Sequence, residues 1–112
     1  MSKYRNKNID KFAEILKALS NPNRLRIFSR LVSCCQKGVS YDAQNGLCPC
    51  VGELGKDLGI AASTLSHHVK ELRRVGLIHV ERNGQKMECW VDNKVLNDLS
   101  GFFEELNKVN IC

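Results

Sequence analysis

Hydrophobic residues in the middle of this 112-residue chain repeat with a helical period twice in quick succession. The first run lies between Cys50 and Leu58, and the second starts after Gly59 and ends at Leu72. Apolar residues three and four positions apart are typical of amphipathic helices, and a glycine between two such runs marks a turn. The stretch therefore predicts two short helices whose inward sides carry Val51, Leu54, Leu58, Leu65, Val69 and Leu72.

The outward side of the second of these helices is polar near its beginning and basic near its end. Short side chains that donate and accept hydrogen bonds suit base edges, and the cations that follow suit phosphates. A solvated helix face is the simpler interpretation, but the tight spacing of the two helices and the hairpin that follows them favour DNA recognition. The predicted DNA-binding residues on this helix are Ser63, Thr64, Ser66, His67, Lys70 and Arg74.

A β-hairpin is predicted next, because two alternating stretches flank Asn83-Gly84, a preferred two-residue turn in which both positions take positive φ. Pairing across this turn matches apolar residues on one face of the hairpin and opposite charges on the other. In this pairing, His79 is a cross-strand partner and Cys89 is a core residue. Arg82 and Lys86 at its tip predict a wing that contacts DNA. The predicted pairs are Val80–Met87, Ile78–Cys89, Leu77–Trp90, His79–Glu88 and Glu81–Lys86.

Helical patterns also flank this central part. Residues 1–8 are polar, and a first helix should follow, burying Ile9, Phe12, Ala13, Leu16 and Leu19. Asn21-Pro22 combines a capping residue with proline at the first helical position, and so starts a second helix. The predicted buried residues of that second helix are Leu25, Phe28, Leu31, Val32 and Cys35.

The last helix is predicted from about Asn93 to Val109 and carries a long apolar stripe. A domain this small has little core for such a helix to cover, so the stripe predicts contact with a partner helix. The predicted dimerisation residues are Leu96, Leu99, Phe103 and Leu106.

Length and composition fit one domain over residues 1–112, with the core and wing at 9–92 and the dimerisation helix at 93–109. The formal charge of +5 favours an acidic partner, and nucleic acid fits better than a membrane because no apolar run approaches a spanning length. With no signal peptide ahead of the first helix, the expected location is the cytoplasm. Neither a Cys-x-x-Cys nor a Cys-x5-Arg motif of thiol reductases occurs, so we expect no enzyme.

Two segments together resemble the ArsR/SmtB family of metal-sensing repressors: LGIAASTLSHHVKELRRVGLI, and LSNPNRLRIF upstream of it. With the wing, the resemblance covers roughly Leu19 to Asp92. It implies a mainly α, winged helix–turn–helix fold with a β-hairpin wing, a homodimer through the first and last helices, and double-stranded operator DNA as partner. Where the family usually has Ser and then Gln, this chain has Ala61 and Ala62, which removes the usual N-cap and one base-reading side chain.

Six cysteines in a chain without a secretory signal point to thiol chemistry or metal binding. Cys48 and Cys50 flank Pro49, which suits the first position of a helix, and Cys34-Cys35 precede the long linker 36–47. These four cysteines are the predicted metal ligands, and thiolate sites select thiophilic ions. Alternatively, Cys35 is a core residue and the others are free thiols; Cys112 is either a further ligand or uninvolved.

The resemblance adds the identity of the ion. Cys50-Val51-Gly52-Glu53-Leu54 looks like the Cys-Val-Cys-Asp-Leu box of the arsenical repressors, with Gly52 where the second cysteine would be. It implies release of the operator on binding As(III) or Sb(III) through three thiolates. The alternatives are a repressor of the same fold that responds to Cd(II), Pb(II), Zn(II) or thiol oxidation, and, more distantly, a small structural zinc module. The family's zinc site on the last helix is absent, since no histidine follows His79.

Overall fold

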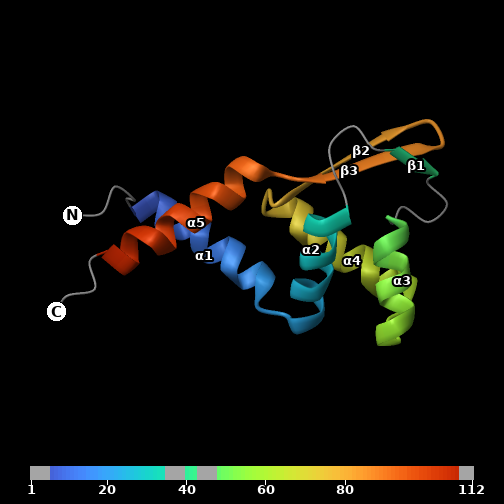
Figure 1. Cartoon of the computed structure of the whole chain (residues 1–112), viewed down its shortest axis with the longest axis horizontal. Helices are drawn as coiled ribbons and strands as arrows, with labels where there is room; N and C mark the ends of the chain where they lie inside the picture. The colour runs from blue at the N-terminus through green and yellow to red at the C-terminus, as the bar shows by residue number, and fades with distance from the viewer. Residues whose placement is uncertain (1–5, 35–39, 43–47, 109–112) are drawn as a thin grey trace.

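The computed structural model describes residues 6–34, 40–42 and 48–108. Within this part of the chain, five helices and three strands form a winged helix–turn–helix, which confirms the predicted fold (Figure 1). The protein is elongated, at 51 × 28 × 21 Å. In chain order the elements are α1 (Asn6–Leu19), α2 (Pro22–Cys34), β1 (Ser40–Asp42), α3 (Pro49–Leu58), α4 (Ala62–Arg74), β2 (Ile78–Asn83), β3 (Lys86–Val91) and α5 (Asn93–Lys108).

The helix starts follow the local sequence signals. Asn21 Oδ1 accepts a hydrogen bond from the backbone N–H of Arg24 at 3.0 Å, so it caps α2 as predicted. Helix α3 begins at Pro49, directly after Cys48, and ends at Gly59, whose φ of 68° lies in the left-handed region. Helix α4 follows Ala61 without a side-chain cap, as the missing serine predicts.

The core lies where α1 to α4 meet the base of the hairpin. Phe12, Phe28, Val51, Leu54, Leu65 and Leu72 are buried as predicted. The inward faces of three helices differ from the prediction, because several predicted core residues are exposed in this single chain and their helical neighbours are buried instead. The exposed residues are Ile9, Ala13, Leu16, Leu25, Val32 and Leu58; the buried neighbours are Ile15, Ala18 and Ile27.

Helices α3 and α4 approach each other at Gly55. A Cβ at this position would overlap Cδ1 of Leu65, which is itself buried in the core. The glycine is therefore required by the close packing of the two helices rather than by its backbone angles. At Gly52, one turn earlier on α3, a Cβ would meet nothing within 4 Å.

The sheet has the strand order β1-β3-β2 with antiparallel pairing throughout. The predicted hairpin register is wrong by two residues, since Asn83 pairs with Lys86 and the turn is therefore Gly84-Gln85. Of the two turn residues, only Gly84 has a positive φ, as in two-residue turns whose first position is glycine. Asn83 therefore remains in the strand. A shift of two residues keeps every side chain on its predicted face, and it brings the buried Val91 opposite Ile78.

The new register changes the predicted pairs on the outer face. Glu81 lies opposite Glu88 rather than Lys86, so the predicted charge complementarity is wrong. His79 lies opposite Trp90, on which it stacks with ring centroids 5.2 Å apart. Its Nε2 is 2.7 Å from Oδ2 of Asp92, whose Oδ1 accepts the Val95 N–H at the start of α5. These hydrogen bonds, that of Val95 first, hold the pKa of Asp92 below its usual range.

Helix α5 lies along α1, with Phe102 stacked on Phe12 at a centroid distance of 4.8 Å (Figure 1). Leu99 is only 7% exposed, because the chain's own core covers it, and its place in a dimer contact stays a prediction. Phe103 and Leu106 are 48% and 47% exposed, and Leu96 is half-buried. Ile9 and Leu16 of α1 add to the apolar surface at this end of the molecule.

Candidate nucleic-acid interface and thiol cluster

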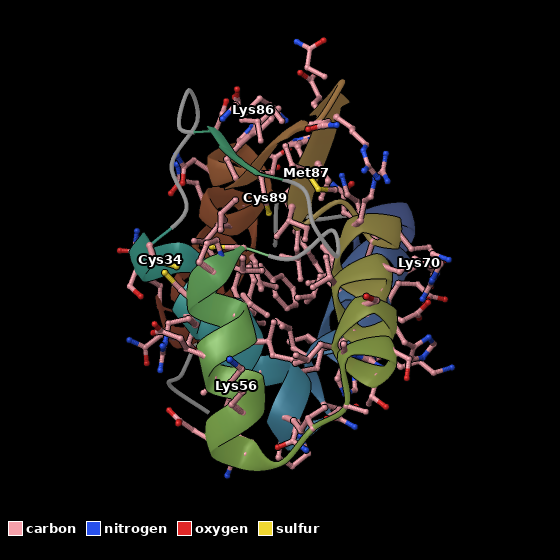
Figure 2. All side chains as sticks on the ribbon, turned by 90° about the vertical axis from the view of Figure 1, so that its right-hand side faces the viewer. Cys34, Lys56, Lys70, Lys86, Met87 and Cys89 are labelled. Atoms are coloured by element: carbon pink, nitrogen blue, oxygen red, sulfur yellow. The ribbon has the colours of Figure 1, made fainter. Side chains whose placement is uncertain are left out.

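The predicted DNA-reading face of α4 is exposed along its whole length. Its first turns present short polar side chains, and Lys70 points away from the body of the protein (Figure 2). The apolar residues of the same helix face inward, with Leu65 and Leu72 buried. The exposed side chains are Ser63, Thr64, Ser66, His67, Lys70 and Arg74.

Arg74, at the end of this face, already has acidic neighbours. Its Nε donates to Oε1 of Glu71 at 3.2 Å, and its Nη2 lies 4.0 Å from Oε2 of Glu14 on α1. All three side chains keep access to water, so these ion pairs contribute little to stability. A phosphate would have to compete with two carboxylates for Arg74, whereas Lys70 has no ion pair among the described residues.

The tip of the wing is exposed, as predicted for a DNA contact. Lys86 begins β3 directly after the turn, and Figure 2 shows it at the end of the hairpin. The Nε of Arg82 donates to the carbonyl oxygen of Gly84 at 3.4 Å, which holds its side chain along the turn. The corrected register leaves both cations at the tip.

His68, on the inner side of α4, is a residue that the sequence analysis missed. It is 6% exposed, and its Nδ1 accepts a hydrogen bond from Nε of Arg24 on α2 at 3.2 Å. Burial, the Arg24 charge and the neighbouring His67 hold the pKa of His68 below its usual value of 6.5. Because Nδ1 accepts from a guanidinium, which can only donate, the imidazole in this arrangement is neutral. The adjacent His67 is exposed. Helical periodicity therefore predicts that one histidine faces inward and the other outward, but it does not predict the contact of His68 with Arg24.

Three cysteines converge where α2 ends and α3 begins. The Sγ atoms of Cys34, Cys48 and Cys50 all lie within 4.8 Å of one another, and those of Cys34 and Cys48 are 3.8 Å apart. Cys48 is buried, whereas Cys34 and Cys50 are half-buried and reachable from solvent. Figure 2 shows Cys34 beside the first turn of α3. The cluster joins the two sides of the linker, as the sequence predicts.

The spacing of the sulfurs suits a metal or metalloid ion. Bonds of about 2.3 Å to a tetrahedral zinc place thiolates roughly 3.8 Å apart, which is the separation of Cys34 and Cys48. Arg30 brings a positive charge to the same place, because its Nη1 donates to the carbonyl oxygen of Cys50 at 3.4 Å. This cation would offset the negative charge of three ion-binding sulfurs.

The remaining cysteines fall into two groups. Cys89 is buried in β3 among core residues, away from the cluster, as predicted (Figure 2). The predicted ligand Cys35 and the terminal Cys112 lie outside the described residues. Within the described chain, the site therefore consists of three of the four predicted ligands.

Comparison with known proteins shows the class to which the chain belongs. Residues 19–81, more than half of the chain, match the helix-turn-helix domain family. The chain is 32% identical over 85 residues to the HTH-type transcriptional regulator YgaV of Escherichia coli, covering 76% of this chain and 74% of that protein. The chain therefore belongs to the helix-turn-helix transcriptional regulators and binds DNA.

Solved structures of other transcriptional regulators share the winged-helix fold of this chain. An ArsR-like transcriptional regulator from Rhodococcus superposes with a TM-score of 0.66 at 17% identity, covering 91% of this chain and 84% of that one. Mb0332 of Mycobacterium bovis, described as a homodimeric winged helix-turn-helix domain and a possible ArsR-family regulator, has a TM-score of 0.58 at 19% identity over 96% and 89% of the two chains. The predicted winged helix–turn–helix fold is thus confirmed. Across residues 6–34 and 48–108, no helix is long and apolar enough to span a membrane.

Proposed function

We propose that this regulator represses transcription in the cytoplasm and releases its operator when As(III) or Sb(III) binds Cys34, Cys48 and Cys50. The observation that carries the proposal is the convergence of three sulfurs within 4.8 Å from two different helices. Three thiolates complete the coordination of a trivalent metalloid, whereas structural zinc requires four ligands. Soft sulfur ligands also exclude hard cations from the site.

Release follows from where the ligands are attached. Cys34 ends α2, while Cys48 and Cys50 lie at the start of α3, the first helix of the DNA-binding pair. An ion that pulls the three sulfurs together moves the start of α3 relative to α2. Because α3 packs on α4 without room for a Cβ at Gly55, the recognition helix moves with it. A hundredfold loss of operator affinity requires about 2.7 kcal/mol of coupling between the two sites.

The proposal includes a homodimer formed by α1 and α5. Phe103 and Leu106 on α5, with Ile9 and Leu16 on α1, leave an apolar surface that water covers in the single chain. The homodimeric Mb0332 shares this fold. Two recognition helices in one dimer would engage two half-sites together, so a change in the angle between them weakens both contacts.

Two other inducers use the same thiols. Cd(II), Pb(II) or Zn(II) would need a further ligand to reach four, and Cys35 adjoins the cluster in sequence. The 3.8 Å separation of Cys34 and Cys48 also favours a thiol-redox alternative. In that reaction the two thiols form a disulfide while a hydroperoxide is reduced to an alcohol and water.

The decisive experiment is a titration of operator-bound protein with each ion under anaerobic, reducing conditions. Fluorescence anisotropy of a labelled duplex selected by the protein from a random pool measures release by As(III), Sb(III), Cd(II), Pb(II) and Zn(II). We expect release at the lowest concentrations with As(III) or Sb(III). Release by Zn(II) or Cd(II) alone would assign the site to a divalent ion, and release by hydroperoxide alone would assign it to redox sensing.

A further inference from the structure

The end of α1 and the recognition helix are joined through one arginine of α2. Arg24 donates from Nη1 to the carbonyl oxygen of Ala18 at 3.1 Å and from Nε to Nδ1 of His68 at 3.2 Å. Ala18 lies in the last turn of α1, where carbonyl groups have no partner within the helix. Arg24 thus donates one hydrogen bond to a free carbonyl group at the end of α1 and another to a side chain of α4.

The proton on His68 decides whether this link can form. A guanidinium only donates, so Nδ1 of His68 must carry a lone pair, and the neutral ring keeps its proton on Nε2. Protonation of Nδ1 removes the acceptor and places a second positive charge beside Arg24. His67 is the other titratable group that bears on His68, and α1 contributes the neutral Ala18 carbonyl through Arg24.

The position of His68 on α4 gives the link a consequence for DNA. His68 faces inward, while Ser66 and His67 on the same turn face outward. The hydrogen bond from Arg24 thus reaches the inner side of a turn of α4, and the outer side of the same turn carries the predicted base contacts. The link can therefore be altered without removing any group from the outer face of α4.

We propose that Arg24 and His68 are positioning residues for operator recognition, and that protonation of His68 loosens the recognition helix and lowers sequence discrimination. The inference uses the established DNA-binding class of the protein and does not depend on the ion that the thiol cluster binds. Neither residue contacts DNA in this proposal, because His68 is buried in the protein core.

The direction of the pH effect follows from the lowered pKa. The unfolded chain binds a proton at His68 more readily than the folded chain, so the free energy of unfolding falls as the pH drops below about 6.5. In the folded protein the link is lost only when the pH falls below the lowered pKa of His68 itself. Operator affinity should therefore be constant above about pH 6.5 and decrease at a lower pH, with a limiting slope of about tenfold per pH unit for one proton.

The test compares operator and random duplexes from pH 5.5 to 8.0 at constant ionic strength, with dithiothreitol and no added metal. The reference protein carries His67→Asn, so that no imidazole lies on the outer side of this turn of α4. The operator is selected with this protein at pH 7.5. Two further variants are made in that background. His68→Asn retains an acceptor near the place of Nδ1 but cannot titrate, and His68→Leu removes the acceptor.

We expect the reference protein to lose operator affinity at low pH while random-duplex affinity does not fall with it. His68→Asn should bind the operator like the reference at pH 7.5 and show a flat pH profile. His68→Leu should lose discrimination by about tenfold at pH 7.5, since the hydrogen bond from a charged donor is gone. Its salt slope should be unchanged, because no phosphate contact is lost.

Two results would overturn the proposal: an unchanged pH profile in His68→Asn, or full discrimination in His68→Leu. Far-UV circular dichroism and urea midpoints at each pH identify the conditions in which every variant is folded. If His68→Leu does not fold, the comparison of His68→Asn with the reference protein still decides. Neither result bears on ion binding by Cys34, Cys48 and Cys50, which this assay leaves untouched.

Discussion

Helix α3 meets its neighbours differently at its two ends. At its start, Cys48 and Cys50 approach Cys34 of α2 through thiols, whose separation an ion or a disulfide would change. Further along, Gly55 approaches Leu65 of α4 so closely that a single added carbon would overlap it. The first contact is adjustable and the second is fixed. We expect a helix held in this way to transmit a displacement from its thiol end to the recognition helix.

The largest effect is expected when the second recognition helix is lost. Phe103→Asp would place a charge in the apolar surface that we assign to the dimer, at a cost of several kcal/mol. Sedimentation should show monomers, and operator affinity should fall about a hundredfold or more because two half-sites are no longer bound together. Because Phe103 is 48% exposed in the single chain, the fold should survive, whereas Leu99→Asp would disturb the core. A Phe103→Asp variant that remains dimeric would move the interface elsewhere.

Removing the adjustable contact should abolish the response to As(III) and leave repression intact. In a Cys48→Ser, Cys50→Ser variant, the coupling of about 2.7 kcal/mol that we require for release should disappear. Cys34→Ser should act in the same direction, since it removes the third sulfur. Cys89→Ser is the matched control, because Cys89 is buried like Cys48 but lies outside the cluster. If the double variant is released at the wild-type As(III) concentration, the sensing site is not at the start of α3.

The fixed contact can be tested with two glycines of the same helix. Gly55→Ala should lower the free energy of unfolding by about 1–3 kcal/mol, because the new Cβ meets a buried leucine. Gly52→Ala should raise it by about 0.5–1 kcal/mol, since an alanine there meets nothing and favours the helix. Urea denaturation of both variants measures the difference. Equal effects at the two positions would show that α3 and α4 are not in close contact.

The smallest effects should come from replacing single side chains on the surface that we expect to face DNA. Ser66→Ala should cost about 1–3 kcal/mol of binding on operator DNA and little on a random duplex. Lys86→Ala should weaken binding to all DNA alike and lower the salt slope by about one. Anisotropy titrations at several salt concentrations separate the two classes. If Ser66→Ala affects both duplexes equally, the predicted reading face of α4 is wrong.

The sequence predicts the helices well, because their signals are local. Pro22 and Pro49 begin helices, Gly59 ends one, and the polar face of α4 is exposed as its periodicity indicates. The hairpin register was beyond the same reasoning, because Asn83-Gly84 and Gly84-Gln85 both suit a two-residue turn. The core decides between these turns by burying Val91 opposite Ile78.

In the candidate site, too, the residues marked by local sequence signals were predicted, and the contacts between distant residues were not. Cys48 and Cys50 adjoin a helix start, so their role could be proposed from spacing, and the other side of the linker supplied Cys34. Arg24 and His68 are 44 positions apart, and no period connects them. Nothing in the local sequence marks Gly55, because the need for glycine there comes from Leu65 of α4. Contacts between distant segments are the part of this molecule that the sequence alone does not reveal.

Strand β1 gives the linker between the sulfurs a role of its own. Of the 13 residues between Cys34 and Cys48, the central Ser40–Asp42 pair with β3, which leaves five residues on each side. Strand pairing therefore attaches the segment that joins Cys34 to Cys48 to the hairpin whose tip carries Arg82 and Lys86. The sulfurs and the predicted wing are thus connected by a second route, which does not pass through α3 and α4.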